Sequence, residues 1–200
     1  MKNRLWRRIV ANHVYFNITS DEPMENCFKS EKFTRDYGNG PFELTELVNV
    51  CNQPFMQEAI KDEEVDEDGW PKDSWNWHVD NCGAKWVNLE DADESYLQGY
   101  SAWSPPIPML EHLAKFAGVE LRMTYEDEFR NFIGVAWADD EGLSSYHEIE
   151  GNDLHQLLLE ELGGEDFPED FDWWEPQDKL DGQSAGEYID EAVYNWFENQ

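Results

Sequence analysis

Residues 96–108 read YLQGYSAWSPPIP, and they set the order of the elements on either side. Residues 96–102 alternate their side chains as a β-strand requires, with aromatic rings on both faces. Pro105, Pro106 and Pro108 cannot donate backbone hydrogen bonds, so this strand must stop before them. Proline is tolerated in the first turn of a helix, where the N–H groups have no helical partner. The sequence therefore predicts a strand that leads directly into a helix.

We expect this helix over residues 106–117. Its apolar residues recur at spacings of three and four, which places them on one face. Gly118 follows where a left-handed C-terminal residue is favoured, so the helix should end there. The apolar face would consist of Ile107, Leu110, Leu113, Ala114 and Ala117.

Two further strands should follow, because apolar residues alternate over 119–125 and again over 130–137. The acidic residues 126–128 between them predict a polar turn, and Gly134 indicates a bulge or a close backbone approach. Residues 12–18 alternate in the same way and should form a central strand of the same sheet. A right-handed strand–helix–strand crossover with a hairpin partner would make this sheet mixed.

The segment that follows the strand at 12–18 is predicted to have less regular structure. Residues 21–37 are interpreted as a helix, because Ser20 or Asp21 can cap it and Pro23 lies near its start. Residues 38–41, Gly-Asn-Gly-Pro, form a break. Residues 42–50 should be a short strand or an ordered loop, and residues 54–60 a helical turn or two.

Charge is the most unusual property of the composition. The 200 residues contain 45 Asp and Glu against 14 Lys and Arg, which gives a net charge of −31. Such a charge repels nucleic acid and anionic membranes, and it favours basic partners or bound cations. With 10 Trp, 8 Tyr and 11 Phe the chain still has enough apolar side chains for a core, so we do not expect disorder.

No cofactor or metal ion is expected. Cys27, Cys51 and Cys82 are far apart, and no Cys-x-x-Cys motif occurs, which argues against a disulfide framework and against zinc. The acidic residues 62–69 imitate the start of a calcium-binding EF-hand loop, but Trp75 stands where the bidentate Glu is required. We therefore expect a solvated loop there.

No segment indicates membrane insertion or secretion. The chain has no apolar run long enough to span a bilayer, and no apolar stretch follows the basic first ten residues as in a signal peptide. We expect a cytoplasmic protein.

A tryptophan-rich stretch offers a second candidate feature. Trp is common in cores and at interfaces, so core packing is preferred over a platform that stacks sugars or bases, which would need basic neighbours for nucleic acid. His78 and Cys82 are close in sequence, but no catalytic role is assigned to them. The stretch contains Trp70, Trp75, Trp77 and Trp86.

Three segments together resemble the YubB-type ferredoxin-like domain family of phage and plasmid proteins. They are residues 81–86 (NCGAKW), residues 100–106 (YSAWSPP) and the hairpin at 119–137, and residues 12–14 resemble that family's opening strand. The resemblance covers about residues 12–18 and 75–138. It implies a ferredoxin-like α+β sheet and an origin in a mobile genetic element, and it implies no catalytic residues.

The fold class expected is α+β: a ferredoxin-like mixed or antiparallel sheet with helices on one face, plus an acidic helical C-terminal extension. Residues 1–138 should form the ferredoxin-like domain, with an insertion around 38–74. Residues 139–200, where Lys179 is the one Lys or Arg, should form the extension packed on it. One helix is expected at Leu154–Leu162 and another at Tyr188–Phe197, because their apolar residues have helical spacing.

The acidic extension is the candidate partner-binding site. Its carboxylates cluster in sequence without local basic residues, and aromatic side chains lie among them. The predicted site residues are Glu160, Glu161, Glu165, Asp166, Glu169, Asp170, Asp172, Trp173, Trp174 and Glu175.

The leading functional hypothesis is a DNA mimic. Duplex DNA carries one negative charge per about 1.7 Å of helix axis, and a surface dense in carboxylates imitates such a row of charges. The partner would be a basic host protein, such as a restriction, nuclease or CRISPR-type defence component, and not nucleic acid or a membrane. The alternatives are an interaction adaptor anchored by Trp173, Trp174 or Trp196, an acid-rich or halophilic soluble protein, and an enzyme with paired carboxylates.

Overall fold

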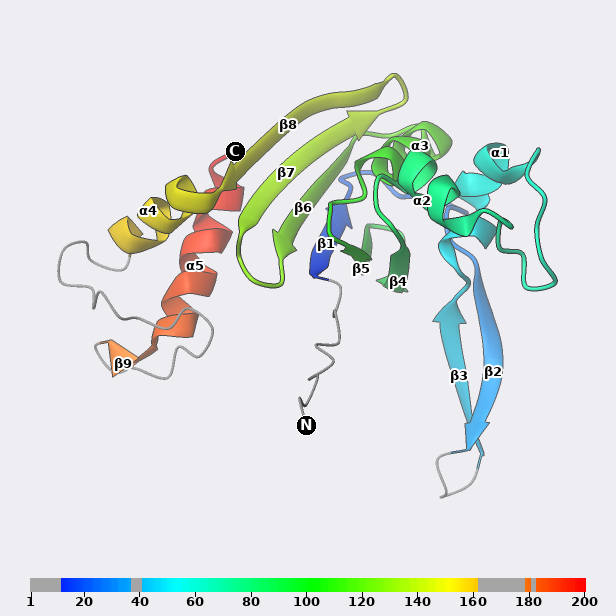
Figure 1. Cartoon of the computed structure of the whole chain (residues 1–200), viewed down its shortest axis with the longest axis horizontal. Helices are drawn as coiled ribbons and strands as arrows, with labels where there is room; N and C mark the ends of the chain where they lie inside the picture. The colour runs from blue at the N-terminus through cyan, green and yellow to red at the C-terminus, as the bar shows by residue number, and fades with distance from the viewer. Residues whose placement is uncertain (1–11, 37–40, 162–178, 181–182) are drawn as a thin grey trace, which may run out of the picture.

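A computed structural model describes residues 12–36, 41–161, 179–180 and 183–200. Its centre is a six-stranded sheet with the order β4-β5-β1-β6-β7-β8 (Figure 1). The sheet strands are β1 (His13–Thr19), β4 (Val87–Ala92), β5 (Tyr96–Ala102), β6 (Leu121–Asp127), β7 (Phe132–Asp139) and β8 (Gly142–Glu150). The remaining short elements are η1 (Val50–Asn52), η2 (Pro54–Met56), α1 (Gln57–Ile60), β9 (Lys179–Leu180) and β10 (Gln183–Ser184).

The fold is α+β and ferredoxin-like, as expected. The order β4-β5-β1-β6 arises because β1 lies between two strands that a helix connects, as in a split β-α-β unit. Strands β5 and β6 run in the same direction, but β1 separates them and pairs antiparallel with both. Every hydrogen-bonded pair of the sheet is therefore antiparallel, so the antiparallel form of the expected sheet is confirmed and the mixed form is wrong.

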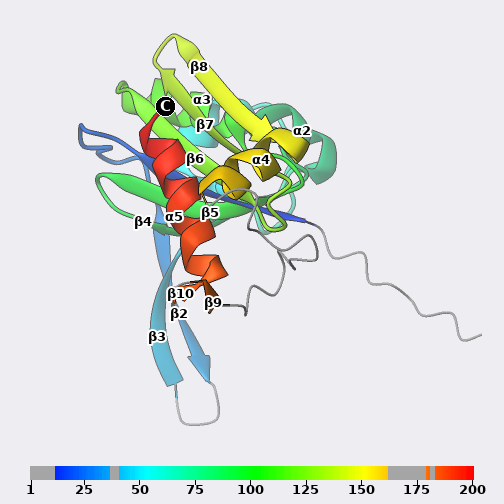
Figure 2. The same ribbon diagram turned by 90° about the vertical axis from the view of Figure 1, so that its left-hand side faces the viewer.

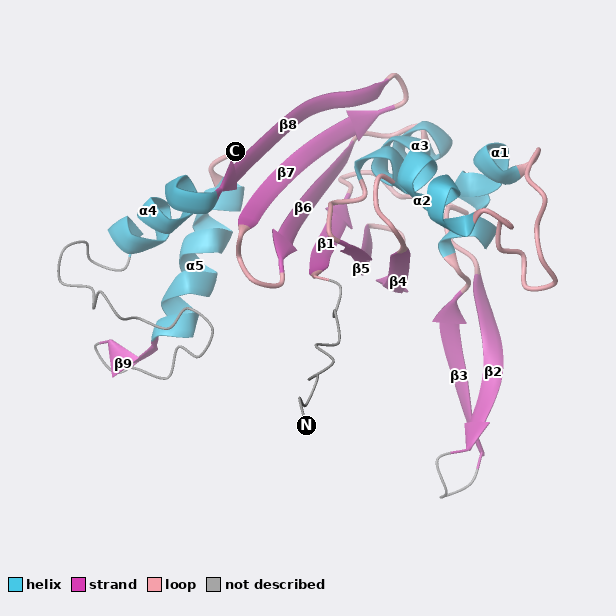
Figure 3. Ribbon diagram, viewed as in Figure 1, coloured by secondary structure: helices cyan, strands magenta, loops and turns pink. Residues whose placement is uncertain are grey.

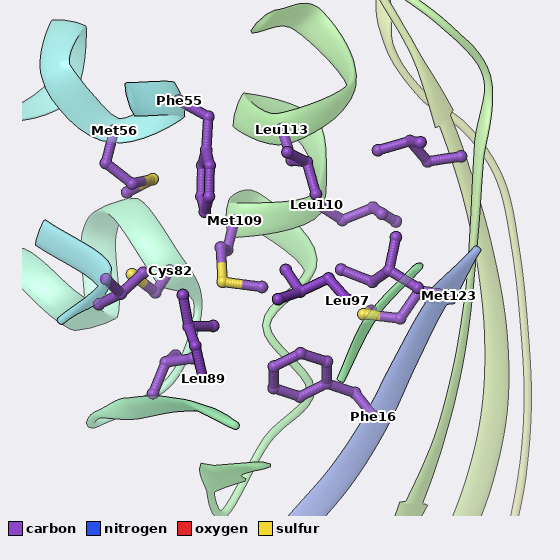
Figure 4. Packing of buried hydrophobic residues seen from close by; sticks show 14 of the residues in the cluster. Phe16, Phe55, Met56, Cys82, Leu89, Leu97, Met109, Leu110, Leu113 and Met123 are labelled. Atoms are coloured by element: carbon purple, nitrogen blue, oxygen red, sulfur yellow. The ribbon is translucent and has the colours of Figure 1, made fainter. Parts of the chain in front are cut away.

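The helix expected after the proline motif is α3 (Ile107–Ala117), and its position is confirmed. Pro106 occupies the N-cap position, and Gly118 ends the helix in the left-handed conformation with φ of 69°. Figure 4 shows Met109 and Leu110 between the sheet residues Phe16 and Met123 and the residues around α2. Fully burying an aliphatic side chain of this size contributes about 1.5–3 kcal/mol, so this helix holds the two layers together.

A second helix, α2 (Ser74–Cys82), covers the same side of the sheet as α3, and η2 packs on α3. Helix α2 was not predicted from the sequence. Its nine residues bury Trp77, His78 and Cys82 in the main core. Gly83 ends it in the left-handed conformation, with φ of 79°. These elements supply the additional cover that one short helix leaves incomplete.

The helix expected over 21–37 is absent from residues 21–36, the part of this segment that the structure describes. The strand β2 (Ser30–Asp36) pairs with β3 (Pro41–Leu47), and the two form a hairpin arm that extends away from the body (Figures 1 and 3). Met24 and Cys27 are buried in the preceding turns. The helix signals were weak because Phe28 and Phe33 have imperfect helical spacing, whereas the Gly/Asn/Pro-rich break favours a turn between strands. A short strand or an ordered loop was expected at 42–50, and the strand occurs as β3; the helical turns expected at 54–60 occur as η2 and α1.

The sheet continues beyond residue 138, where the helical extension was expected to begin. Strand β8 pairs with β7 along its whole length, so residues 142–150 belong to the sheet. The two helices of the extension are present as α4 (Gly151–Glu161) and α5 (Ala185–Glu198). Leu154, Ala192 and Val193 pack on Ile133, whose side chain lies on the face of β7 opposite the main core. Figure 2 shows α5 beside this end of the sheet.

Candidate interaction surface

The predicted acidic site lies mostly beyond the residues that the structure describes. Glu160 is exposed near the end of α4, and Glu161 is the last residue of that helix. The structure therefore places two of the predicted site residues on one helix and does not test whether the others join them. Outside the described residues are Glu165, Asp166, Glu169, Asp170, Asp172, Trp173, Trp174 and Glu175.

Five Lys and Arg side chains of the described residues are bound to carboxylates. Arg130 Nε lies 2.6 Å from Glu126 and its guanidinium also contacts Asp190, while Arg122 lies 3.8 Å from Glu198. Three lysines follow the same pattern, because few bases share the surface with many acids. Their pairs are Lys29–Glu31, Lys61–Glu58 and Lys72–Glu64. The remaining exposed carboxylates thus face solvent with little local neutralisation.

The acidic loop at 62–68 is solvated, as expected. Its carboxylate-bearing side chains are exposed, and Asp66 accepts hydrogen bonds from the backbone N–H groups of Asp68 and Trp70. Asp66 is therefore used to close a turn. Within the described ranges, no group of three or more His, Cys, Asp or Glu side chains is arranged to hold a metal ion.

An aromatic cluster occupies the sheet face opposite the main core. We call His13, Tyr15, Trp86 and Tyr100 the sheet-face cluster; Tyr15 on β1 lies directly opposite Tyr100 on β5. The His13 ring packs edge-on against Tyr100, Trp86 and Tyr15, with ring centroids 5.0, 5.6 and 6.2 Å apart. Tyr15 remains 48% exposed. The alternation of β1 predicts that His13 and Tyr15 share a face, but it does not predict their aromatic neighbours Trp86, just before β4, and Tyr100 on β5.

Carboxylates border this cluster. Glu128 accepts a hydrogen bond from the His13 backbone N–H at 3.1 Å, and the same oxygen lies 3.5 Å from His13 Nδ1. Glu126 lies opposite Tyr15 on β6, and Glu90 is exposed at the bulge of β4. Burial, followed by Glu128, Glu90 and Tyr100, raises the pKa of the Tyr15 hydroxyl. Glu128 and Glu90 therefore lie close enough to the exposed ring to disfavour negative charge on its hydroxyl.

The tryptophan-rich stretch is divided between core and surface. Trp77 is buried and donates a hydrogen bond to the Ala59 carbonyl, which confirms core packing for that residue. Trp75 is 53% exposed and lies over Lys85, whose Nζ is 4.1 Å from its ring centroid. Trp103, 55% exposed, covers the same ammonium group at 5.1 Å. Trp103 has a φ of 74°, unusual for a bulky residue, and the sequence gives no signal for it.

A cysteine–histidine contact exists, but it involves Cys51 and not Cys82. His78 Nδ1 donates to the Ser74 carbonyl at 2.6 Å, so Nε2 is free to accept from the Cys51 thiol at 3.9 Å. Burial raises the pKa of Cys51 to about 12 and lowers the pKa of His78. Both groups are buried and neutral, so this pair is part of the core and does not produce a thiolate nucleophile.

Trp196, one of the expected anchors, is half-buried and packs against the cluster formed by Ile133, Ala192 and Val193. The Arg122 guanidinium donates to the neighbouring Phe197 carbonyl and thereby fixes the end of α5 to the sheet. In the described structure, this part of the chain contributes to packing.

Comparisons with known proteins give little guidance. No family model and no curated protein matches the chain. A crystal structure of a protein api92 from Yersinia pseudotuberculosis, associated with the family model DUF1281, aligns with a TM-score of 0.31 and 16% identity. The alignment covers 38% of this chain and 30% of that one, so the chain spans under a third of its length. None of the helices that the structure describes has the length and apolar character needed to cross a membrane.

Proposed function

We propose that this chain is an acidic DNA mimic, encoded by a phage or plasmid, that binds and inhibits a host DNA-binding defence protein of the restriction, nuclease or CRISPR type. It acts in the host cytoplasm by occupying a basic cleft, without a catalytic step. The observation that carries the proposal is the net charge of −31 on a folded domain. The resemblance to the YubB-type family supports the mobile-element origin.

The distribution of ion pairs supports this proposal further. Since the described residues contain far more carboxylates than bases, and five of the Lys and Arg side chains are already paired, the excess carboxylates are available to a partner. A basic cleft that binds DNA would gain the same electrostatic attraction from this surface. Opposite charges also accelerate association and make it sensitive to salt.

The test is capture of proteins from host lysate on the full chain, followed by elution with duplex DNA. The proposal expects a DNA-binding protein that duplex DNA releases, and whose DNA cleavage or binding the purified chain inhibits. A partner that DNA does not displace, or one that loses no activity, would contradict mimicry. A matched bait with Asp62, Glu63, Glu67 and Asp68 changed to their amides measures how strongly capture depends on total charge.

An interaction adaptor is the second candidate, and the exposure of Trp75 and Trp103 favours it. Exposed Trp side chains are frequent hot spots at protein interfaces. If they anchor a partner, Trp75→Ala should mainly accelerate dissociation, and duplex DNA should not displace the bound protein. Under the mimic proposal, the same substitution leaves DNA-sensitive capture intact.

A further inference from the structure

The sheet-face cluster is accessible as well as aromatic. Beside the half-exposed Tyr15, the side chains of Asn17, Asn88 and Gln98 are also exposed on this face of β1, β4 and β5. The packing of α5 reaches Ile133 on β7 and Arg122 on β6, next to this area. The half of the sheet formed by β4, β5 and β1 therefore presents its aromatic rings to solvent.

Both the rings and their surroundings favour a cation. The faces of aromatic rings carry negative partial charge, and they attract ammonium and guanidinium groups. Glu128 and Glu90 add full negative charges close to Tyr15. Arg130, a nearby base, is already paired with Glu126 and Asp190, so it does not neutralise this face.

We propose that the sheet-face cluster, with Glu90 and Glu128, binds an arginine side chain of a basic protein partner. This inference rests on the proposed function, because it identifies the part of the surface that contacts the basic cleft. The contact would add to the general attraction between the acidic surface and the cleft. A cleft that binds DNA exposes arginine to phosphates, and the same side chain meets ring faces and carboxylates here.

Arginine fits this face better than the other ligand classes. Its planar guanidinium stacks on aromatic rings, is weakly hydrated and forms paired hydrogen bonds to a carboxylate, whereas the lysine ammonium is compact and strongly hydrated. Nucleic-acid bases also stack on aromatic platforms, but those sites require a positive surround. The carboxylates at this face repel phosphate, so the occupant is a cation.

The experiment compares nona-arginine with nona-lysine peptides, titrated into the full chain at about 0.15 M salt. Both peptides carry the same charge, so their affinity ratio isolates the contribution of the guanidinium groups. We expect the parent to prefer the arginine peptide, and Tyr15→Ala to reduce that preference about two- to fivefold, as expected for one exposed cation–π contact. Tyr15→Phe retains the ring and should retain the preference.

Tyr194→Ala is the matched control, because Tyr194 is an exposed tyrosine (61%) on α5. It should leave the affinity ratio unchanged, and far-ultraviolet circular dichroism should show that every variant is folded. An unchanged ratio in folded Tyr15→Ala overturns this inference while leaving DNA-displaceable capture, and hence mimicry, unaffected. Conversely, an arginine preference that depends on Tyr15 without any DNA-sensitive partner supports the site and contradicts the proposed function.

Discussion

The ring of Tyr125 lies directly over Gly134 on the neighbouring strand. The two residues are paired across β6 and β7, and a methyl group added at Gly134 would overlap the Tyr125 ring. The Tyr125 hydroxyl continues across the sheet and donates to Glu148 on β8 at 2.8 Å. Of the two alternatives expected for Gly134, a bulge or a close approach to the backbone, the structure shows the close approach, made by the Tyr125 ring. The approach allows one side chain to span three strands.

Replacing Gly134 with Ala should destabilise the protein by about 1–3 kcal/mol, the usual cost of overpacking a filled core. Urea denaturation measures this difference. In a Tyr125→Leu background the substitution should cost less, because the clashing ring and hydroxyl are absent. If the two changes prove additive, the ring over Gly134 is not the cause.

His78 should make the stability of the fold depend on pH on the acidic side. Burial lowers its pKa, so the unfolded chain, with a pKa of about 6.5, takes up this proton more readily than the folded one. The contribution is complete above about pH 6.5, and it falls by at most about 1.4 kcal/mol for each pH unit below that, until the folded pKa is reached.

The measurement compares the free energy of unfolding of the parent and of His78→Phe between pH 7 and pH 5. Phe retains a ring against Trp70, which stacks on His78, but it cannot titrate. The parent should lose stability relative to the variant as pH falls. His112, whose pKa burial also lowers, is common to both proteins and cancels in the comparison. Parallel curves would show that His78 is protonated equally in both states.

The central fold was predictable because its signals are local. The alternation of residues 119–125, the proline-initiated helix and Gly118 each specify their own conformation, and they occur as expected. Strand β8 was missed because it is an edge strand whose side chains are mostly exposed, so it lacks an apolar period. Strand β2, and with it the hairpin arm, was missed because charged residues interrupt the alternation of residues 30–36.

The candidate surface was less predictable, because it depends on contacts distant in sequence. Glu128 binds the backbone of His13 across 115 residues, and only the strand register brings them together. Trp103 is likewise exposed at a residue with a left-handed backbone conformation, and composition indicates neither property. Composition predicted the charge of the surface, whereas the geometry of the rings required the fold.

The thiols should be unreactive in the native protein. Cys27, Cys51 and Cys82 are all buried and free, and burial raises the pKa of each one. Because the thiolate is the reactive form, a disulfide reagent such as Ellman's reagent should label native protein only as fast as the core opens. In denaturing urea, all three should react rapidly. Fast labelling of the native state would contradict the burial of at least one thiol.

The acidic extension, residues 139–200, should govern association with the partner. Changing Glu160, Glu165, Glu169 and Asp170 to their amides removes four charges, and we expect slower association with little change in stability, because exposed charges act mainly through steering. Stopped-flow association with the captured partner, over a salt series, measures this effect. The difference from the parent should disappear at high salt, where charges are screened within a few ångströms.

The matched control removes four charges from the exposed loop instead, at Asp62, Glu63, Glu67 and Asp68. If the acidic extension is the binding site, its variant should associate more slowly than the loop variant of equal net charge. Equal association rates for the two charge variants would mean that only total charge matters. Separately, Trp173→Ala or Trp174→Ala should mainly accelerate dissociation if these rings are anchors. A C-terminal variant that binds as fast as the parent at low salt would remove this zone from the interface, because a carboxylate row that faces a basic cleft cannot be neutralised without loss of attraction.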